Sequence, residues 1–98
     1  MMIEIKKMGA DAVIEISGRL DTTTAPVLDK TIRENISENI NLTLDLKGLE
    51  YISSAGLRVL LSAQKRMQTS GSMKLRNVCE EVMDVFEMTG FADILEFV

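Results

Sequence analysis

The stretch LTLDLKGLEYISSAGLRVLL, residues 42–61, predicts a strand followed closely by a helix. Every second residue from Leu42 to Leu46 is a leucine with a polar residue between, which is the pattern of a strand with one buried face. Gly48 is expected to end this strand. A helix is expected from Ser54 to Gly71, because the apolar residues after Ser54 recur at helical spacing. Its inward positions are Leu57, Leu60, Leu61, Gln64 and Met67.

The segments before this stretch predict a hairpin and a first helix. Ile3–Met8 and Ala12–Gly18 alternate apolar and polar residues around a short connection, as the two strands of a β-hairpin do. A helix then follows, because apolar residues recur three or four positions apart. Thr23 or Thr24 can cap this helix, and Pro26 suits its first turn, where the backbone N–H has no helical partner. Its inward stripe consists of Ala25, Leu28, Ile32 and Ile36.

The segments after the stretch predict one more strand, a third helix and a tail. Met73–Val78 alternates like a strand, and Glu80–Gly90 has helical spacing that Gly90 terminates. Asp93–Val98 is expected to dock as a short extended tail. The inward residues of the third helix are Val82, Val85 and Phe86.

The order of elements predicts a single α/β domain over residues 1–98. Alternating strands and helices give a sheet that is parallel through right-handed βαβ units, and the N-terminal hairpin adds an antiparallel pair, so the sheet is mixed and packed by helices. The loops Gly18–Thr23 and Gly48–Ser54 leave neighbouring strands at their carboxyl ends, where α/β proteins place their sites. Asp21 is therefore expected to lie close to Ser53 and Ser54.

Composition excludes several classes of function. The 98 residues include no histidine, which removes every mechanism that needs imidazole. A net charge of −4 with four aromatic residues argues against a nucleic-acid surface. Cys79 is the only cysteine, so there is no internal disulfide. No apolar run is long enough to span a membrane and no signal peptide is recognisable, so we expect a cytoplasmic protein without membrane insertion.

The motif ISSAG, residues 52–56, lacks the companions that catalysis needs. A serine nucleophile requires a base, no lysine is obviously placed to act as one, and the pattern is not the G-x-S-x-G of hydrolases. One glycine without a P-loop lysine does not make a phosphate-binding loop. The carboxylates show no metal-ligand spacing. A serine hydrolase is thus the weakest of the functions considered, and no cofactor or metal is expected.

Ser53 and Ser54 have two compatible roles. Either hydroxyl can cap the helix, which composition alone favours. The same place suits a phosphate, because the free N–H groups and the dipole at a helix N-terminus stabilise an anion. A phosphoserine here would leave the fold intact and spoil an interface that buries the loop.

Three segments resemble the signature segments of a known family. GRLDTTTAPVLDKTI, LTLDLKGLEYISSAGLRVLL and VFEMTGFADILEF are similar in order and spacing to those of STAS domains, most closely to bacterial anti-sigma factor antagonists. The family motif is usually Asp-Ser-Ser/Thr-Gly-Leu, and counting back from Gly56 puts its phosphorylated serine at Ser54. Here Ser53 stands in place of the family's aspartate and Ala55 in place of its second hydroxyl residue. Ser53 is therefore a competing phosphorylation site.

The resemblance implies a phosphorylation-switched binding protein that is not itself an enzyme. The unphosphorylated form would bind an anti-sigma factor, which is a serine kinase, and so free a sigma factor for transcription. Phosphorylation of Ser54 would release this partner, and a serine phosphatase would restore binding. We expect a monomer when the protein is free. The implied partner-binding residues are Asp21, Thr22, Ser53, Ser54, Ala55, Gly56 and Arg58, with Lys65 as a further contact at the rim.

Other interpretations remain open. Asp21 matches a family aspartate beside the phosphorylated serine, and it equally fits a turn residue that starts the first helix. Arg58 and Lys65 lie off the inward stripe of their helix and are also explained as solvated charges. The alternative function is that of a STAS accessory module that binds a nucleotide or a component of a transporter or lipid-transport system.

Overall fold

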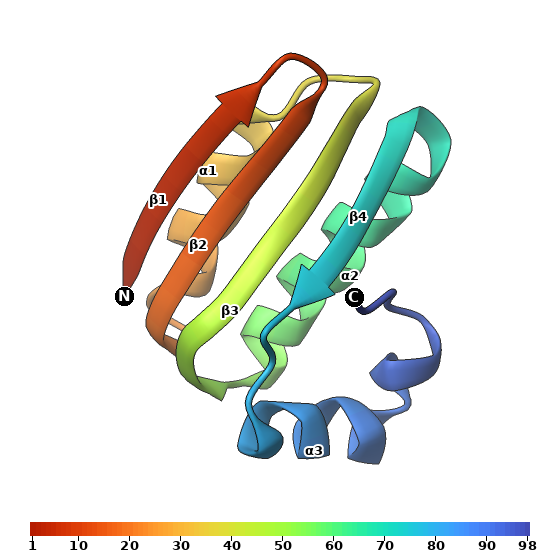
Figure 1. The fold of residues 1–98 in the computed structure, drawn as a ribbon. Coiled ribbons are helices and arrows are strands. Elements are labelled where there is room, and N and C mark those ends of the chain that lie inside the picture. The colour runs from red at the N-terminus through yellow and green to blue at the C-terminus, as the bar shows by residue number, and fades with distance from the viewer.

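The computed structural model describes every residue from Met1 to Val98. Strands and helices follow one another in the predicted order, and a short 3-10 helix precedes the C-terminal tail (Figure 1). The elements are β1 (Met2–Met8), β2 (Asp11–Leu20), α1 (Ala25–Asn35), β3 (Ile40–Ile52), α2 (Ser54–Ser70), β4 (Gly71–Arg76), α3 (Glu80–Thr89) and η1 (Phe91–Asp93).

The four strands form one mixed sheet in the order β1-β2-β3-β4. β1 and β2 are antiparallel, and the pairs β2–β3 and β3–β4 are parallel. This arrangement confirms the predicted hairpin followed by parallel βαβ units. β4 begins at Gly71, two residues before the predicted start, and ends at Arg76.

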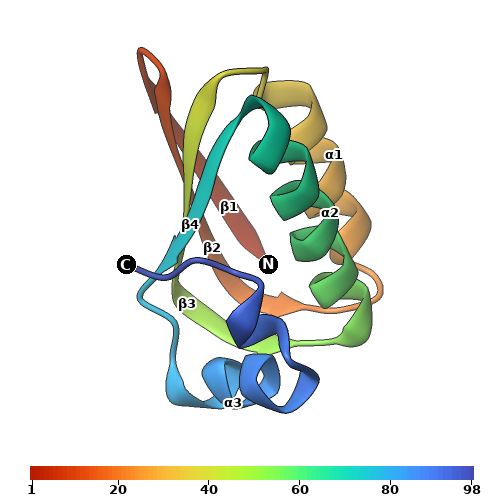
Figure 2. The same ribbon diagram turned by 90° about the vertical axis from the view of Figure 1, so that its right-hand side faces the viewer.

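Helices α1 and α2 pack against one face of the sheet, and the other face is open (Figure 2). α3 lies at the end of the sheet where the parallel strands finish (Figure 1). The leucines predicted to face inward on β3 are buried, and the polar residues between them are only half-buried. One cluster of 22 buried apolar residues fills the space between sheet and helices. None of the helices has the length and apolar character needed to cross a membrane.

Two strands continue through glycines that were predicted to end them. β2 runs past Gly18 to Leu20, and β3 runs past Gly48 to Ile52, because the two strands keep pairing in parallel. The pairing register shifts between Glu15 and Ser17 and again between Gly18 and Arg19. A Cβ on Gly48 would lie 2.6 Å from the Cβ of Ser17, so this glycine allows a close approach at an irregularity in the ladder. The prediction that these glycines start loops was wrong.

The C-terminal tail docks beside β4, as predicted. Leu75 donates its N–H to the carbonyl oxygen of Glu96, and Val98 donates to the carbonyl oxygen of Leu75. The rings of Phe86 on α3 and Phe97 in the tail lie 5.9 Å apart. These contacts hold the tail and α3 against the sheet.

Gln64 is the one buried polar residue of the core, with 5% of its surface exposed, and its Oε1 accepts no hydrogen bond. A buried acceptor without a donor costs about 1–3 kcal/mol. We therefore expect Gln64→Met, which keeps the length of the side chain, to raise the free energy of unfolding by about 1 kcal/mol or more in urea titrations. Gln64→Glu should lower it, because a charge then replaces the amide. A stability loss in Gln64→Met would contradict this account.

Candidate functional site

The ends of β2 and β3 bring the two predicted site segments together. Leu20 and Ile52 are paired neighbours, and the N–H of Ser53 donates a hydrogen bond of 2.9 Å to the carbonyl oxygen of Leu20. Asp21 follows Leu20 directly. The expected proximity of Asp21 to the two serines is therefore confirmed, although the segments that meet are strand ends and not long loops.

Ser53 is the N-cap of α2. Its Oγ accepts a hydrogen bond of 3.5 Å from the N–H of Gly56, and its carbonyl oxygen accepts the first helical bond, from Leu57, at 2.9 Å. The residue is half-buried. This capping hydrogen bond is long, so the Oγ satisfies the N–H of Gly56 only weakly.

Ser54 is the first residue of α2, and its side chain is exposed. The guanidinium of Arg58, one turn further along the helix, donates to the Oγ of Ser54 at 3.5 Å and to its carbonyl oxygen at 3.4 Å. Both distances are long for hydrogen bonds, so the hydroxyl is loosely held. The two serines therefore differ in role: one caps the helix, and the other presents a hydroxyl to solvent beside a cation.

Gly56 is buried in the first turn of α2. A Cβ at this position would lie 2.7 Å from Cγ of Leu20 and 2.9 Å from Cγ1 of Ile52. The glycine thus lets the start of the helix rest directly on the strand ends. Although Gly56 was predicted among the partner-binding residues, it acts in the structure through this close approach.

Asp21 shapes the turn before α1. Its Oδ1 accepts hydrogen bonds from the hydroxyl and N–H of Thr23, at 2.8 and 3.0 Å, and from the N–H of Thr24, at 3.1 Å. The hydroxyl of Thr24 donates instead to the carbonyl oxygen of Arg19, at 2.8 Å. Thr24 is the N-cap residue of α1, one of the two positions predicted, and Thr23 is not. The side chain of Thr24 accepts no hydrogen bond from a helical N–H, because its hydroxyl accepts from the N–H of Asp21 and donates to Arg19.

The same hydrogen bonds lower the pKa of Asp21, chiefly the one from the hydroxyl of Thr23 and next the one from the N–H of Thr24. A carboxyl whose pKa is lowered by folding stabilises the protein above its unfolded pKa of about 3.9, and this contribution disappears as the pH falls through the folded pKa. We expect Asp21→Asn to be less stable than the parent at neutral pH, and the difference to shrink below about pH 4. Urea unfolding at a series of pH values measures it. A difference that does not change with pH would contradict the assignment.

A groove of about 310 Å³ lies between the N-terminal turns of α1 and α2. Of the predicted partner-binding residues, Thr22, Ala55 and Arg58 line it. The groove residues on α1 could not be predicted, because neither helix alone shows which residues of the two helices come together. The additional lining residues are Ala25, Pro26, Asp29 and Val59.

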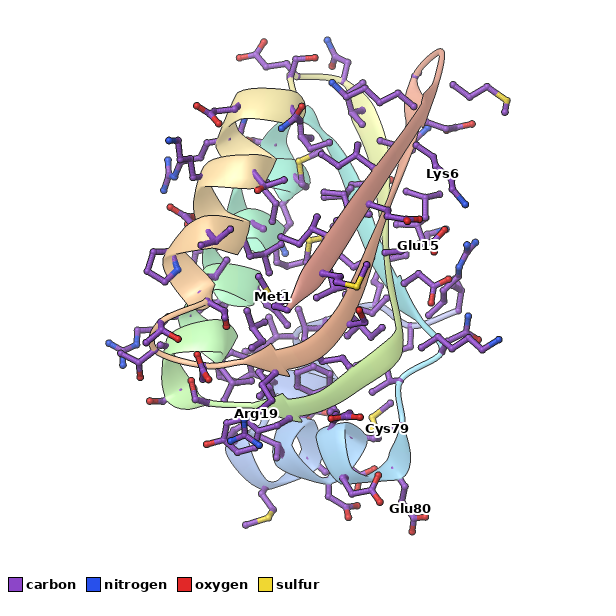
Figure 3. All side chains as sticks on the ribbon, turned by 90° about the vertical axis from the view of Figure 1, so that its left-hand side faces the viewer. Met1, Lys6, Glu15, Arg19, Cys79 and Glu80 are labelled. Carbon is purple, nitrogen blue, oxygen red and sulfur yellow. The ribbon has the colours of Figure 1, made fainter.

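Two further exposed residues flank the site and were missed. The guanidinium carbon of Arg19 lies 4.1 Å from the ring centroid of Tyr51, which is within range of a cation–π interaction. Both residues are exposed at the paired ends of β2 and β3 (Figure 3 labels Arg19). Lys65 is exposed further along α2 and lies outside the groove.

The chemistry of the site favours binding and phosphate acceptance. No group of three or more carboxylate or cysteine side chains is placed to hold a metal ion. The first turn of α2 offers free N–H groups, a hydroxyl at Ser54 and the guanidinium of Arg58. A phosphate on Ser54 would gain from the helix dipole and from a charge-assisted contact with this guanidinium.

The mixed sheet of four strands packed by helices agrees with the fold that the resemblance implies. A family model described as "STAS domain" matches residues 2–98. The chain belongs to the STAS domain family. The anti-sigma-B factor antagonist of Bacillus subtilis is 30% identical over 95 residues, which cover 96% of this chain and 87% of that protein.

Solved STAS structures share the fold at lower identity. The crystal structure of an anti-sigma factor antagonist from Mycobacterium paratuberculosis has a TM-score of 0.87 at 20% identity and covers 98% of this chain and 83% of its own. The Bacillus cell fate determinant SpoIIAA in its phosphorylated form has a TM-score of 0.74 at 16% identity, with coverage of 99% and 91%. The overall fold is thus common to these proteins and to this chain.

Proposed function

We propose that this STAS domain is an anti-sigma factor antagonist switched by phosphorylation of Ser54. In its unphosphorylated form it binds an anti-sigma factor that is also a serine kinase, and so frees a sigma factor. Phosphorylation of Ser54 ends this binding, and a serine phosphatase restores it. The observation that carries the proposal is the exposed hydroxyl of Ser54 at the N-terminus of α2.

The two serines support the choice of Ser54 over Ser53. Ser53 is half-buried and its Oγ faces the N–H of Gly56 in the first turn of α2, so a kinase would have to move the helix start to reach it. The hydroxyl of Ser54 is exposed, and its one contact is the long one with Arg58. The active site of a kinase can therefore reach the hydroxyl of Ser54 without disturbing the helix.

The partner surface consists of the serine segment and the neighbouring groove. The groove is lined by both apolar and charged side chains, the charged ones being Arg58 and Asp29. A partner that fills this groove covers Ser54, so a phosphate there meets a desolvated interface. This contact surface consists of Asp21, Thr22, Ser53, Ser54, Ala55 and Arg58.

The remaining parts of the proposal follow from this role. The domain, residues 1–98, is a substrate of the kinase and phosphatase and performs no catalysis of its own, which agrees with the absence of histidine. Its partners in transcription control place it in the cytoplasm. The relative from Bacillus subtilis, an anti-sigma-B factor antagonist that is 30% identical, supports the proposed role as an antagonist.

Phosphorylation assays with the anti-sigma factor kinase from the same organism test the proposal. We expect the kinase to bind the unphosphorylated protein and to transfer one labelled phosphate from ATP to it. Ser54→Ala should take up no label, whereas Ser53→Ala should be labelled like the parent. Equal labelling of Ser54→Ala and the parent would refute the site. Capture of a transport protein or a nucleotide, with no binding of the kinase, would refute the function.

A further inference from the structure

β1 is an open edge of the sheet. It pairs with β2 on one side only, and Figure 3, which looks onto this edge, shows α1 beside it and not across it. The opposite edge is partly covered, because the tail residue Phe97 bridges to Leu75 of β4. Met2 and Met8 of β1 are 69% and 82% exposed. An uncovered edge strand with exposed apolar residues is a template for pairing with another strand.

The hairpin determines which backbone groups of β1 face outward. Met8 and Asp11 are paired and flank a two-residue turn, so they exchange both backbone hydrogen bonds. Hydrogen-bonded pairs alternate along an antiparallel ladder. The N–H and C=O groups of Ile3, Ile5 and Lys7 therefore point away from β2, free to bond a second strand.

A second copy of β1 satisfies these groups in an antiparallel register centred on Ile5. Ile5 then faces Ile5 of the second copy, and Glu4 faces Lys6 of the second copy on the open face of the sheet. By symmetry the charge pair occurs twice. Met2 faces Met8 of the second copy, so the two most exposed apolar side chains of the strand cover each other. Opposite charges directly across an antiparallel pair stabilise it.

Other registers are worse. A shift of one residue would place outward groups against groups already bonded to β2. The smallest shifts that keep the hydrogen bonds in phase put Glu4 opposite Glu4 in one direction and Lys6 opposite Lys6 in the other. Like charges directly opposite are destabilising. One register thus satisfies the backbone, the charges and the methionines together.

We infer that β1 is a self-association surface through which two copies of this chain join their sheets edge to edge. Lys6 lies 2.7 Å from Glu15 of its own chain, and both side chains are on the open face (Figure 3). In the dimer, Lys6 lies between Glu15 of its own chain and Glu4 of the second copy. This proposal differs from the expectation that the free protein is a monomer. The contact leaves Ser54 free, because β2 separates β1 from β3 and α2 follows β3.

Reversing the charges of Glu4 and Lys6 on β1 tests this inference. The association is measured by sedimentation equilibrium at protein concentrations from about 10 µM to 1 mM. The parent should show a concentration-dependent dimer. Glu4→Lys should raise its dissociation constant about tenfold or more, because both charge pairs become repulsive. Lys6→Glu should do the same. The double variant Glu4→Lys, Lys6→Glu should return to within about threefold of the parent, which loss of folding could not mimic.

A second variant tests the backbone contact. Lys7→Pro removes an N–H that faces outward and none that bonds β2, so it should weaken the dimer about tenfold and leave the circular dichroism spectrum unchanged. Ser54→Asp should leave dimerisation unchanged, and Glu4→Lys should leave labelling of Ser54 unchanged, so this inference and the proposed function fail separately. A parent that stays monomeric at about 1 mM, or a dimer unaffected by Glu4→Lys and Lys7→Pro, would overturn the inference.

Discussion

Replacing Ser54 with aspartate is expected to weaken binding of the unphosphorylated protein to its anti-sigma factor by at least about 100-fold. The carboxylate puts a charge where the bound anti-sigma factor excludes water, and such a charge without a matched group on the anti-sigma factor costs about 2–5 kcal/mol. The fold should tolerate it, because an acid in the first turn of α2 interacts favourably with the helix dipole. Calorimetric titration measures the affinity, and thermal unfolding should give a melting temperature within about 3 °C of the parent's.

Ser53→Asp is the matched control for this experiment. It adds the same charge one residue earlier, at the N-cap, where aspartate caps as well as serine does. Its affinity for the anti-sigma factor should fall at least about tenfold less than that of Ser54→Asp, because the side chain of Ser53 is half-buried and faces the N–H of Gly56. If both aspartates weaken binding equally, the switch depends on the net charge of the segment and not on the hydroxyl of Ser54.

Replacing Gly71 with alanine is expected to lower the free energy of unfolding by at least about 3 kcal/mol. Gly71 joins α2 to β4 with a φ of 156°, and a Cβ there would overlap the carbonyl oxygen of Ile40, its paired neighbour on β3. A backbone atom of a central strand cannot move aside as a side chain can. The melting temperature should fall by more than about 10 °C.

Gly90→Ala is the control that separates the cost of backbone strain from the overlap of a Cβ at position 71 with Ile40. Gly90 ends α3 with a φ of 82°, and its Cβ would meet no atom within 4 Å. The substitution should cost only about 1–2 kcal/mol, the price of a left-handed conformation. Equal losses in Gly71→Ala and Gly90→Ala would show that the contact with Ile40 adds nothing.

Much of the fold could be predicted because it depends on local periodicity. The alternating leucines of β3 and the three- and four-residue spacing from Ala25 to Ile36 are buried as predicted. The errors lie at Gly18 and Gly48, where a glycine that usually ends a strand instead lets two paired strands approach closely. A single strand carries no information about the partner that makes this glycine necessary.

The site could be predicted only in part. The motif around Ser54 and its position at a helix start follow from the residues themselves. The difference between the capping Ser53 and the exposed Ser54 does not, since both are serines and either could cap a helix equally well. The groove residue Asp29 was not predicted, because it lies on α1 and the motif lies on α2, and only the packing of the two helices brings them to one groove.

The sequence by itself determined the order of elements, the buried face of each and the place of the serine motif, because these depend on spacing within one segment. Only the tertiary structure decided which hydroxyl is free, how Asp21 bonds and which edge of the sheet stays open. Those features arise where segments distant in the chain meet, as when Ser53 bonds Leu20 across the ends of β2 and β3. Spacing along one segment cannot specify contacts that depend on the geometry of two.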